Sequence, residues 1–362
     1  MTKTKLLAAA VVLQCIGGYG ISHADWTDQI KFKGDMRLRH ETIAVENKDT
    51  RNRERIRLRF GAEATPSDDL KVVLQLASGS DDPISTNQTL GSAFTTKSIG
   101  IDLAYLQWKP ATAKFLTVEG GKIKNPFHSA GGTELVWDSD LNPEGFVLGL
   151  EGVGKRISAF LTLAGLPVVE RSSAEDAVLY GGQGGVTLAV DQRGTSLALG
   201  VGYFDYSNTQ GFAPFYDTDD GFGNTVSAVG EYLNDYNLLE AYAELHLKAG
   251  TAPASVFFDL VNNTSPDDRN TGWLLGLTAG KCKDPGSYQF RYNYRDIERD
   301  AVIGAFTDSD FRGGGTDAKG HEVGLDVQVT KPVKIAVSYF HNLLDVQETA
   351  YDRLQLDLNV KF

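Results

Sequence analysis

The sequence predicts an all-β fold, a transmembrane antiparallel up-and-down β-barrel of about sixteen strands. Three observations lead to this prediction. Many segments alternate strictly between apolar and polar residues, the connections between them alternate in length, and the chain ends on Phe362 at the apolar face of its last segment. Alternation places the two residue types on opposite faces of a strand, and in a membrane barrel these faces meet lipid and a watery lumen.

Residues 1–24 have the composition of a signal peptide. Two lysines near the start precede an apolar run over residues 6–13, and residues 22–24 form a small-residue cleavage site. The apolar run is too short to span a bilayer as a helix. We therefore expect this segment to be cleaved after export through the inner membrane, and residues 25–362 to form the barrel domain.

Charge and cysteine content limit the possible functions of the mature chain. Without Lys3 and Lys5, 33 of the 35 basic residues remain against 47 acidic ones, a net charge of −14. Such an acidic chain is not expected to bind nucleic acid. Cys282 is then the one remaining cysteine, so no intramolecular disulfide can form. No later segment reaches about 18 uninterrupted apolar residues, which excludes transmembrane helices but not barrel strands.

The first two expected strands carry rows of arginine. Residues 51–61 alternate between an apolar face, Ile56, Leu58 and Phe60, and a basic face, Arg53, Arg55, Arg57 and Arg59. The strand expected before it, residues 30–43, places Arg37 and Arg39 on its polar face. With a hairpin loop at residues 45–51, we expect Arg39 opposite Arg57 and Glu41 opposite Arg55.

The remaining segments repeat this pattern to the end of the chain. Long connections, such as residues 80–97, 125–143, 207–234 and 298–318, alternate with short ones, such as residues 109–112, 152–154, 283–286 and 330–332. Outer-membrane barrels have short periplasmic turns and longer outer loops, and an even number of strands. A large secreted all-β protein would also show alternating strands, but the regular loop lengths and the terminal phenylalanine favour the barrel.

Several stretches resemble a known family, the putative porins of Gram-negative bacteria. They are residues 51–61, residues 121–127 (GKIKNPF), residues 137–145 (WDSDLNPEG) and residues 292–311, which contain YNYRD and DAVIGAFTDSDF. The resemblance extends over essentially the whole mature chain. It implies an outer-membrane channel of sixteen strands, embedded in outer-membrane lipid and homotrimeric, through which small hydrophilic solutes and ions diffuse passively. It implies no catalytic residues, no metal and no cofactor.

The resemblance also implies where the channel narrows. In porins of this size the loop after the fifth strand folds inward, and here that loop is Asn125–Pro143. Its acidic residues and the one just after it are Glu134, Asp138, Asp140 and Glu144, and the arginines expected across the lumen are Arg37, Arg39, Arg53, Arg55, Arg57 and Arg59. Facing rows of opposite charge would create a transverse field in a constriction. Alternatively, the arginines are solvated lumen charges that Glu41, Glu54 and Glu63 partly neutralise.

Three other functions are compatible with parts of the sequence. The arginine rows favour a channel selective for anionic nutrients such as phosphate or carboxylates, although the acidic total opposes it. A barrel phospholipase-type enzyme would need a serine and a histidine together on the lipid face, and Ser338 near His341 is the one local indication. A purely structural barrel would be plugged by its own loops.

Two further motifs have simpler explanations than ligand binding. Residues 181–185 (GGQGG) are not followed by a helical pattern, which excludes a phosphate-binding loop, so we expect these glycines to permit close packing or a bend. Residues 217–221 (DTDDG) resemble part of a calcium loop but lack the distal glutamate, and we expect a solvated acidic loop. The histidines do not show zinc-ligand spacing.

Overall fold

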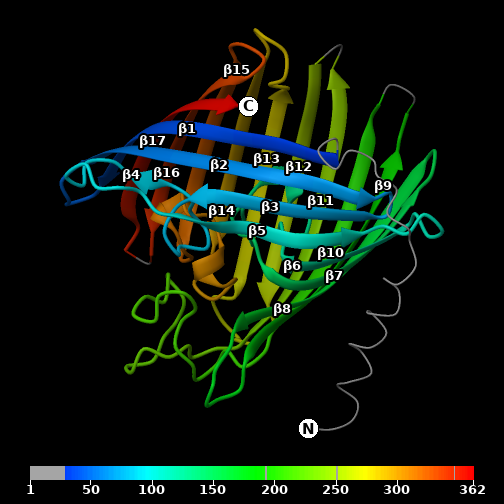
Figure 1. Cartoon of the computed structure of the whole chain (residues 1–362). Coiled ribbons are helices and arrows are strands. Elements are labelled where there is room, and N and C mark those ends of the chain that lie inside the picture. The colour runs from blue at the N-terminus through cyan, green and yellow to red at the C-terminus, as the bar shows by residue number, and fades with distance from the viewer. Residues whose placement is uncertain (1–28, 192–193, 250–251, 346) are drawn as a thin grey trace.

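The computed structural model describes residues 29–191, 194–249, 252–345 and 347–362, and the expected signal peptide lies outside them. The described strands form one antiparallel sheet in which β1 pairs with both β2 and β17, so the sheet closes into a barrel (Figure 1). The strands are β1 (Ile30–Val45), β2 (Arg51–Ser67), β3 (Leu70–Ser78), β4 (Gln88–Thr89), β5 (Ile99–Trp108), β6 (Leu116–Lys122), β7 (Glu144–Val153), β8 (Ile157–Val169), β9 (Ala177–Ala189), β10 (Ser196–Tyr206), β11 (Tyr236–Ala249), β12 (Ala252–Asn263), β13 (Thr271–Gly280), β14 (Tyr288–Ile297), β15 (Ala318–Gln328), β16 (Val333–Leu344) and β17 (Thr349–Lys361).

The predicted number of strands is confirmed. The two-residue β4 pairs with β2 beyond the end of β3, and the other strands make a closed wall of sixteen. Every pairing between neighbouring strands is antiparallel, and successive wall strands are neighbours, as an up-and-down barrel requires. Among the described residues, no helix is both long enough and apolar enough to cross a membrane.

The wall exposes its apolar side chains and buries its charged ones. On β2, Leu58 is 38% exposed and Phe60 is 45% exposed, whereas Arg57 is 9% exposed. The last strand shows the same inversion, with Leu356 exposed and Arg353 buried. A soluble protein would lose hydrophobic stabilisation by leaving such a surface in water. The arrangement is that of a barrel whose outer face contacts lipid and whose lumen is polar.

The seam between the first and last strands is closed by the end of the chain. Phe362 donates its backbone N–H to the Gly34 carbonyl over 3.0 Å and accepts from the Gly34 N–H over 2.8 Å. The Phe362 ring covers Gly34, where a Cβ would overlap it. Closure leaves no unpaired sheet edge in lipid, where an unsatisfied backbone group would cost several kcal/mol.

The expected register of the first hairpin is wrong by two residues. Arg39 pairs with Arg55, and Glu41 pairs with Arg53, in place of the expected Arg57 and Arg55. The chain reverses around Asn47, whose φ of 61° lies in the left-handed region that asparagine tolerates. Because side chains alternate with a period of two, this shift keeps every arginine on its expected face and changes its neighbours.

Three long loops share one apolar core with the inward faces of the wall. They are the crossing loop (residues 123–143, after β6), residues 207–235 after β10, and the facing loop (residues 298–317, after β14). Short 3-10 helices lie in the crossing loop, η2 (Ala130–Gly132), and in the facing loop, η3 (Gly304–Phe306) and η4 (Phe311–Gly313). Buried side chains from the loops are Phe127, Trp137, Phe215, Tyr232, Val302 and Phe311, and those from the wall include Phe204, Tyr206 and Phe257.

The outward orientation of the apolar faces leads to a first prediction. Leu356→Arg places a charge on the exposed face of β17 and should destabilise the barrel by about 2–4 kcal/mol if that position lies near the bilayer midplane. Asn359→Arg, on the lumen side of the same strand, is the matched control and should cost far less. Urea titration of barrels folded into lipid vesicles measures both. Equal destabilisation by the two variants would contradict the assignment of the faces.

Candidate functional site: a polar chamber inside the barrel

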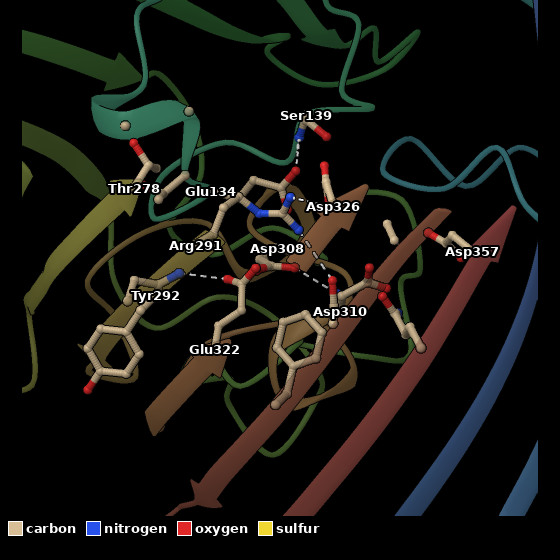
Figure 2. A pocket seen from close by; sticks show the side chains of 18 of the residues that line it. Glu134, Ser139, Thr278, Arg291, Tyr292, Asp308, Asp310, Glu322, Asp326 and Asp357 are labelled. Carbon is tan, nitrogen blue, oxygen red and sulfur yellow. Dashed lines mark hydrogen bonds and ion pairs between the residues drawn. The ribbon is translucent and has the colours of Figure 1, made fainter. Parts of the chain in front are cut away.

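A polar chamber of about 260 Å³ lies inside the barrel, between the crossing loop, the facing loop and a wall formed by β1 and β14–β17, to which Phe257 of β12 and Thr278 of β13 also contribute (Figure 2). Its lining is dense in charge. The basic residues are Arg37, Arg39, Arg291, Arg295 and Lys334, and the acidic residues are Glu134, Asp308, Asp310, Glu322, Asp326 and Asp357. A space with this lining favours hydrated, polar solutes over apolar ones.

The wall charges of the chamber pair with one another. Arg295, 2% exposed, binds Asp308 over 2.7 Å and Glu322 over 3.0 Å, and its guanidinium lies 4.4 Å from the centre of the Phe311 ring. Asp326 receives Arg291 over 2.6 Å and Lys334 over 2.7 Å. A guanidinium suits such bridging because it has five N–H donors in a fixed plane. The chamber therefore has many fixed charges and little net charge.

The predicted arginine rows are paired in the same way. Arg53 and Arg55 bind Glu41, which is fully buried, over 2.5 and 3.1 Å. Arg57 and Arg59 bind Asp35 over 2.9 and 3.0 Å, and Arg39 binds Asp357 over 2.7 Å and Asp310 over 3.1 Å. Of the acids expected to neutralise these rows, Glu41 does so, whereas Glu54 pairs with His40 and Glu63 with Lys33.

Arg37 differs from the other arginines in its row. It lines the chamber and donates to Asn87 over 2.6 Å, while its carboxylate partner, Asp357, lies 3.9 Å away. Its neighbours Arg39 and Arg57 are paired with closer carboxylates. Arg37 is therefore the arginine of the predicted rows that is held least tightly by an acid.

The crossing loop reaches the far side of the barrel interior. Its helix η2 lies against β11, β12 and β13, although the loop starts at β6. Gly131, with a φ of 61°, packs on the inward-facing Phe257 ring of β12, and a Cβ there would lie 2.5 Å from that ring. Glycine is needed at this position both for its left-handed backbone and for the close approach.

The structure separates the four acids predicted for this region. Asp140 lies directly against the arginines, 3.3 Å from Arg59 and 3.7 Å from Arg57. Glu134 and Asp138 instead meet Asp308 of the facing loop, with carboxylate oxygens within 4.8 Å of one another. Glu144 belongs to β7, is 65% exposed and pairs with Lys122. The predicted set is therefore distributed over three places.

Burial changes the protonation of the acids that meet at the facing loop. It raises the pKa of Glu134 and of Asp138 above the ordinary carboxyl range. The charges of Asp138 and Asp308 act in the same direction on Glu134, and those of Asp140 and Asp308 on Asp138. Three carboxylates at this spacing offer the oxygen ligands that hard cations prefer. The Arg295 guanidinium already neutralises part of this charge through Asp308.

Two Asp-Ser-Asp turns join the loops, and sequence reasoning missed their relationship. In each turn the first aspartate accepts the backbone N–H two residues on, over 2.7 Å, as Asp138 does from Asp140 and Asp308 from Asp310. The Asp138 N–H donates to the Phe306 carbonyl, and the Ser309 N–H donates to the Asp138 carboxylate. The repeated DSD at residues 138–140 and 308–310 was the available signal.

Other arginines that line the chamber or lie next to it were also missed as site residues. Arg291 and Arg295 were visible on the polar face of β14, and Arg353 on that of β17, but nothing in the sequence connected them to the loops. Arg353 binds Asp310 over 2.7 Å and Glu41 over 3.1 Å, so it joins the facing loop to the first hairpin. These partners are far apart in the chain, which is why local patterns do not reveal them.

The serine and histidine considered for an enzyme lie on opposite faces of β16. Ser338 lines the chamber, whereas His341 is exposed and pairs with Asp352 over 2.8 Å. Residues three apart on a strand point to opposite sides. These two side chains therefore do not form a catalytic pair.

Comparison with known proteins gives a family and several structural neighbours. The model of the family described as "Putative porin" matches residues 43–228 and 224–362. No curated protein matches significantly. The chain is similar in structure to OprB of Pseudomonas putida at high pH, with a TM-score of 0.62, 12% identity, and coverage of 93% of this chain and 95% of that one.

Two further neighbours are porins of other bacteria. OmpF of Salmonella typhi, in complex with daunomycin, has a TM-score of 0.56 and 15% identity over 93% of this chain and 99% of that one. A triple mutant of the Rhodopseudomonas blastica porin has a TM-score of 0.52 and 13% identity over 92% of this chain and 100% of that one. At these identities the neighbours establish the fold alone.

The buried pairing of the arginines leads to a second prediction. Arg55→Glu would place a carboxylate beside fully buried Glu41 and should strongly reduce the yield and stability of the folded barrel. If the arginines were solvated lumen charges, the same substitution would leave the fold intact. Arg51→Glu, at the exposed start of β2, is the control. Heat-modifiable gel mobility and urea titration report folding, and a variant as stable as the control would contradict the pairing.

Proposed function

Because the chain belongs to the Putative porin family and is an outer-membrane channel for passive diffusion, we propose that solutes cross the barrel through the polar chamber and that this chamber is the narrowest part of the path. The observation that carries the proposal is the course of the crossing loop. It runs from β6 to the inward face of β12 and brings Glu134 and Ser139 into the chamber lining. A loop that crosses a lumen must reduce its open cross-section.

The charges of the chamber favour a weakly selective channel over one for anionic nutrients. The arginine rows that motivated an anion channel are held by Asp35, Glu41, Asp310 and Asp357. The chamber itself has five basic and six acidic residues in its lining. We propose a weak preference for cations, with Glu134 as the main contributor because it lines the chamber and its carboxylate accepts from the Ser139 N–H instead of pairing with an arginine.

We propose that a transverse electric field acts across the pathway, although the residues that create it differ from those expected. Glu134 and Asp308 lie on the side of the two loops, whereas Arg37 lies on the β1 wall. Fixed charges of opposite sign on opposing sides orient dipolar solutes as they pass. Of the predicted acids, Asp140 is already bound by two arginines and contributes less to this field.

We further propose a homotrimer in the outer membrane of a Gram-negative bacterium, with the signal peptide removed after Ala24. The resemblance to general porins supports the trimer, and the composition of residues 1–24 supports the cleavage. Chemical cross-linking in outer-membrane fragments and N-terminal sequencing of the mature protein test these two points. Monomers alone, or an N-terminus elsewhere, would contradict them.

The role of Glu134 gives a third prediction. Glu134→Gln should lower the cation-to-anion permeability ratio about twofold, because one fixed negative charge disappears from a narrow polar passage. In the unchanged protein, cation preference should fall on acidification, and since the pKa of Glu134 is raised, the fall should begin above the ordinary glutamate pKa of about 4.3. The variant should have a weaker pH dependence.

Reversal potentials in asymmetric salt across planar bilayers measure both effects. Glu144→Gln is the matched control, because Glu144 is exposed, pairs with Lys122 and lies outside the chamber lining. If Glu134→Gln and Glu144→Gln gave the same reversal potential as the unchanged protein, the chamber would not be the selective part of the path.

A further inference from the structure

The glycine-rich run of β9, residues 181–185, lies directly beneath the start of the crossing loop. Its inward-facing members are Gly181, Gln183 and Gly185, since side chains alternate along the strand. Gln183 is fully buried. From the sequence we expected these glycines to permit close packing or a bend, and in the structure side chains of the crossing loop and of β11 pack there.

Gln183 holds one residue of the crossing loop by its backbone. Its Oε1 accepts the His128 N–H over 2.7 Å, and its Nε2 donates to the His128 carbonyl over 2.9 Å. The same Nε2 donates to Glu240 Oε2 over 2.7 Å, which fixes the orientation of the amide. The side chain thus acts as an additional peptide group, pairing with both polar groups of His128 as a neighbouring strand would.

Gly181 contacts Phe127, the loop residue just before His128. The Phe127 ring lies on Gly181 so closely that a Cβ there would overlap the ring. The same ring packs against Phe204 of β10 at 4.7 Å and against Trp137 of the crossing loop at 5.7 Å between centroids. The absence of a side chain at Gly181 therefore creates the space that the loop occupies.

The imidazole of His128 is held on the same surface. It pairs with Glu244 of β11, and its ring lies 4.9 Å from that of Tyr242. Tyr242 in turn lies over Gly185 and Gly200, where a Cβ would overlap it. Three neighbouring strands thus contact residues 127 and 128 of the loop: β9 provides an amide and bare backbone, β10 the Phe204 ring, and β11 a carboxylate.

This attachment lies a short distance from the chamber. Gly131, on Phe257, follows His128 by three residues, and Glu134, in the chamber lining, follows it by six. Six residues span at most about 20 Å when fully extended, so the position of His128 limits where Glu134 can lie. The segment from His128 to Glu134 is therefore held at one end by the attachment to β9 and at the other by the contact with the facing loop.

We propose that Gly181 and Gln183 form a docking cradle for the crossing loop and act as positioning residues that set the size of the channel opening. The proposal rests on the proposed function, because it assumes that the crossing loop bounds the narrowest passage. Gln183 does not touch the solute; it acts through His128 and the loop that follows. Loss of the cradle should let the loop leave the lumen for part of the time and widen the passage.

The test is Gln183→Leu, which keeps the approximate volume and removes the three hydrogen bonds. It removes the partners that Gln183 gives to the N–H and C=O of His128, which disfavours the docked loop. We expect a unitary conductance about 1.5–2 times that of the unchanged protein, and a higher rate of disaccharide entry relative to pentose entry in liposome swelling. A residue that merely supports folding would change the yield of barrels, not these two properties of folded ones.

A pair of glycine variants gives the matched control. Gly181→Ala introduces a methyl group where the Phe127 ring lies and should widen the channel in the same way. Gly184→Ala, three residues on, is accommodated at ordinary contact distance, with its nearest neighbour at 3.4 Å, and should leave conductance and size selection unchanged. Heat-modifiable gel mobility selects folded protein for every measurement.

The outcomes separate this proposal from the proposed function. Folded Gln183→Leu with unchanged conductance and unchanged sugar ratio overturns the cradle. If that variant does not fold, Phe127→Ala, which changes the loop and leaves the wall intact, decides in its place: a wider channel supports the cradle, and an unchanged one overturns it. If Glu134→Gln changes the permeability ratio as predicted but the cradle variants change nothing, only the role of the cradle is rejected. If Glu134→Gln has no effect, the proposal that solutes pass through the chamber is rejected.

Discussion

Mutual neutralisation of charge inside the barrel is the constraint on which this structure depends. The inward faces of β1, β2 and β17 hold the buried arginines Arg39, Arg57 and Arg353, and an unpaired charge at such a position would be very costly. Glu41 meets Arg53, Arg55 and Arg353 at once, and Asp310 meets Arg39 and Arg353. Arginine suits such a cluster because it stays protonated among like charges.

The same pairing connects the loops to the wall. Each Asp-Ser-Asp turn uses its first aspartate to close the turn and to contact the other loop, and its last aspartate to bind arginines of the wall, Asp140 at β2 and Asp310 at β1 and β17. Without these two aspartates the arginines would keep fewer partners. Without the arginines the loops would carry buried acids into the lumen. Wall and loops therefore stabilise each other, and the apolar core of Phe204, Trp137 and Phe306 forms behind them.

The sequence was sufficient for the features that depend on local periodicity. The two faces of each strand, the number of strands and the orientation of the arginine rows follow from alternation and loop length, and a two-residue error in the first hairpin left all of them unchanged. The partners of the charges did not follow. Arg353 meets Glu41 across the closing seam, and Glu134 meets Asp308 through two loops more than 170 residues apart, as the Thr307 bond to the Glu134 carbonyl indicates. Such contacts depend on closure of the barrel and on the path of the loops, which a single sequence does not specify. The GGQGG run lies between these two cases. Its composition indicated close packing or a bend, but did not indicate which segment of the chain packs against it.

One region of the barrel wall contributes charge to the chamber, and another holds the crossing loop in place. The charges that a solute meets come from the loops and from β1 and β14–β17, whereas the crossing loop is attached through β9–β12. Substitutions in the first region change charge beside the solute and leave the attachment in place. Substitutions in the second change the position of the loop without adding or removing a charge in the chamber. Charge selection and size selection can therefore vary separately in this fold, because the charged side chains of the chamber come from one part of the wall, whereas the crossing loop is held mainly by uncharged contacts with another.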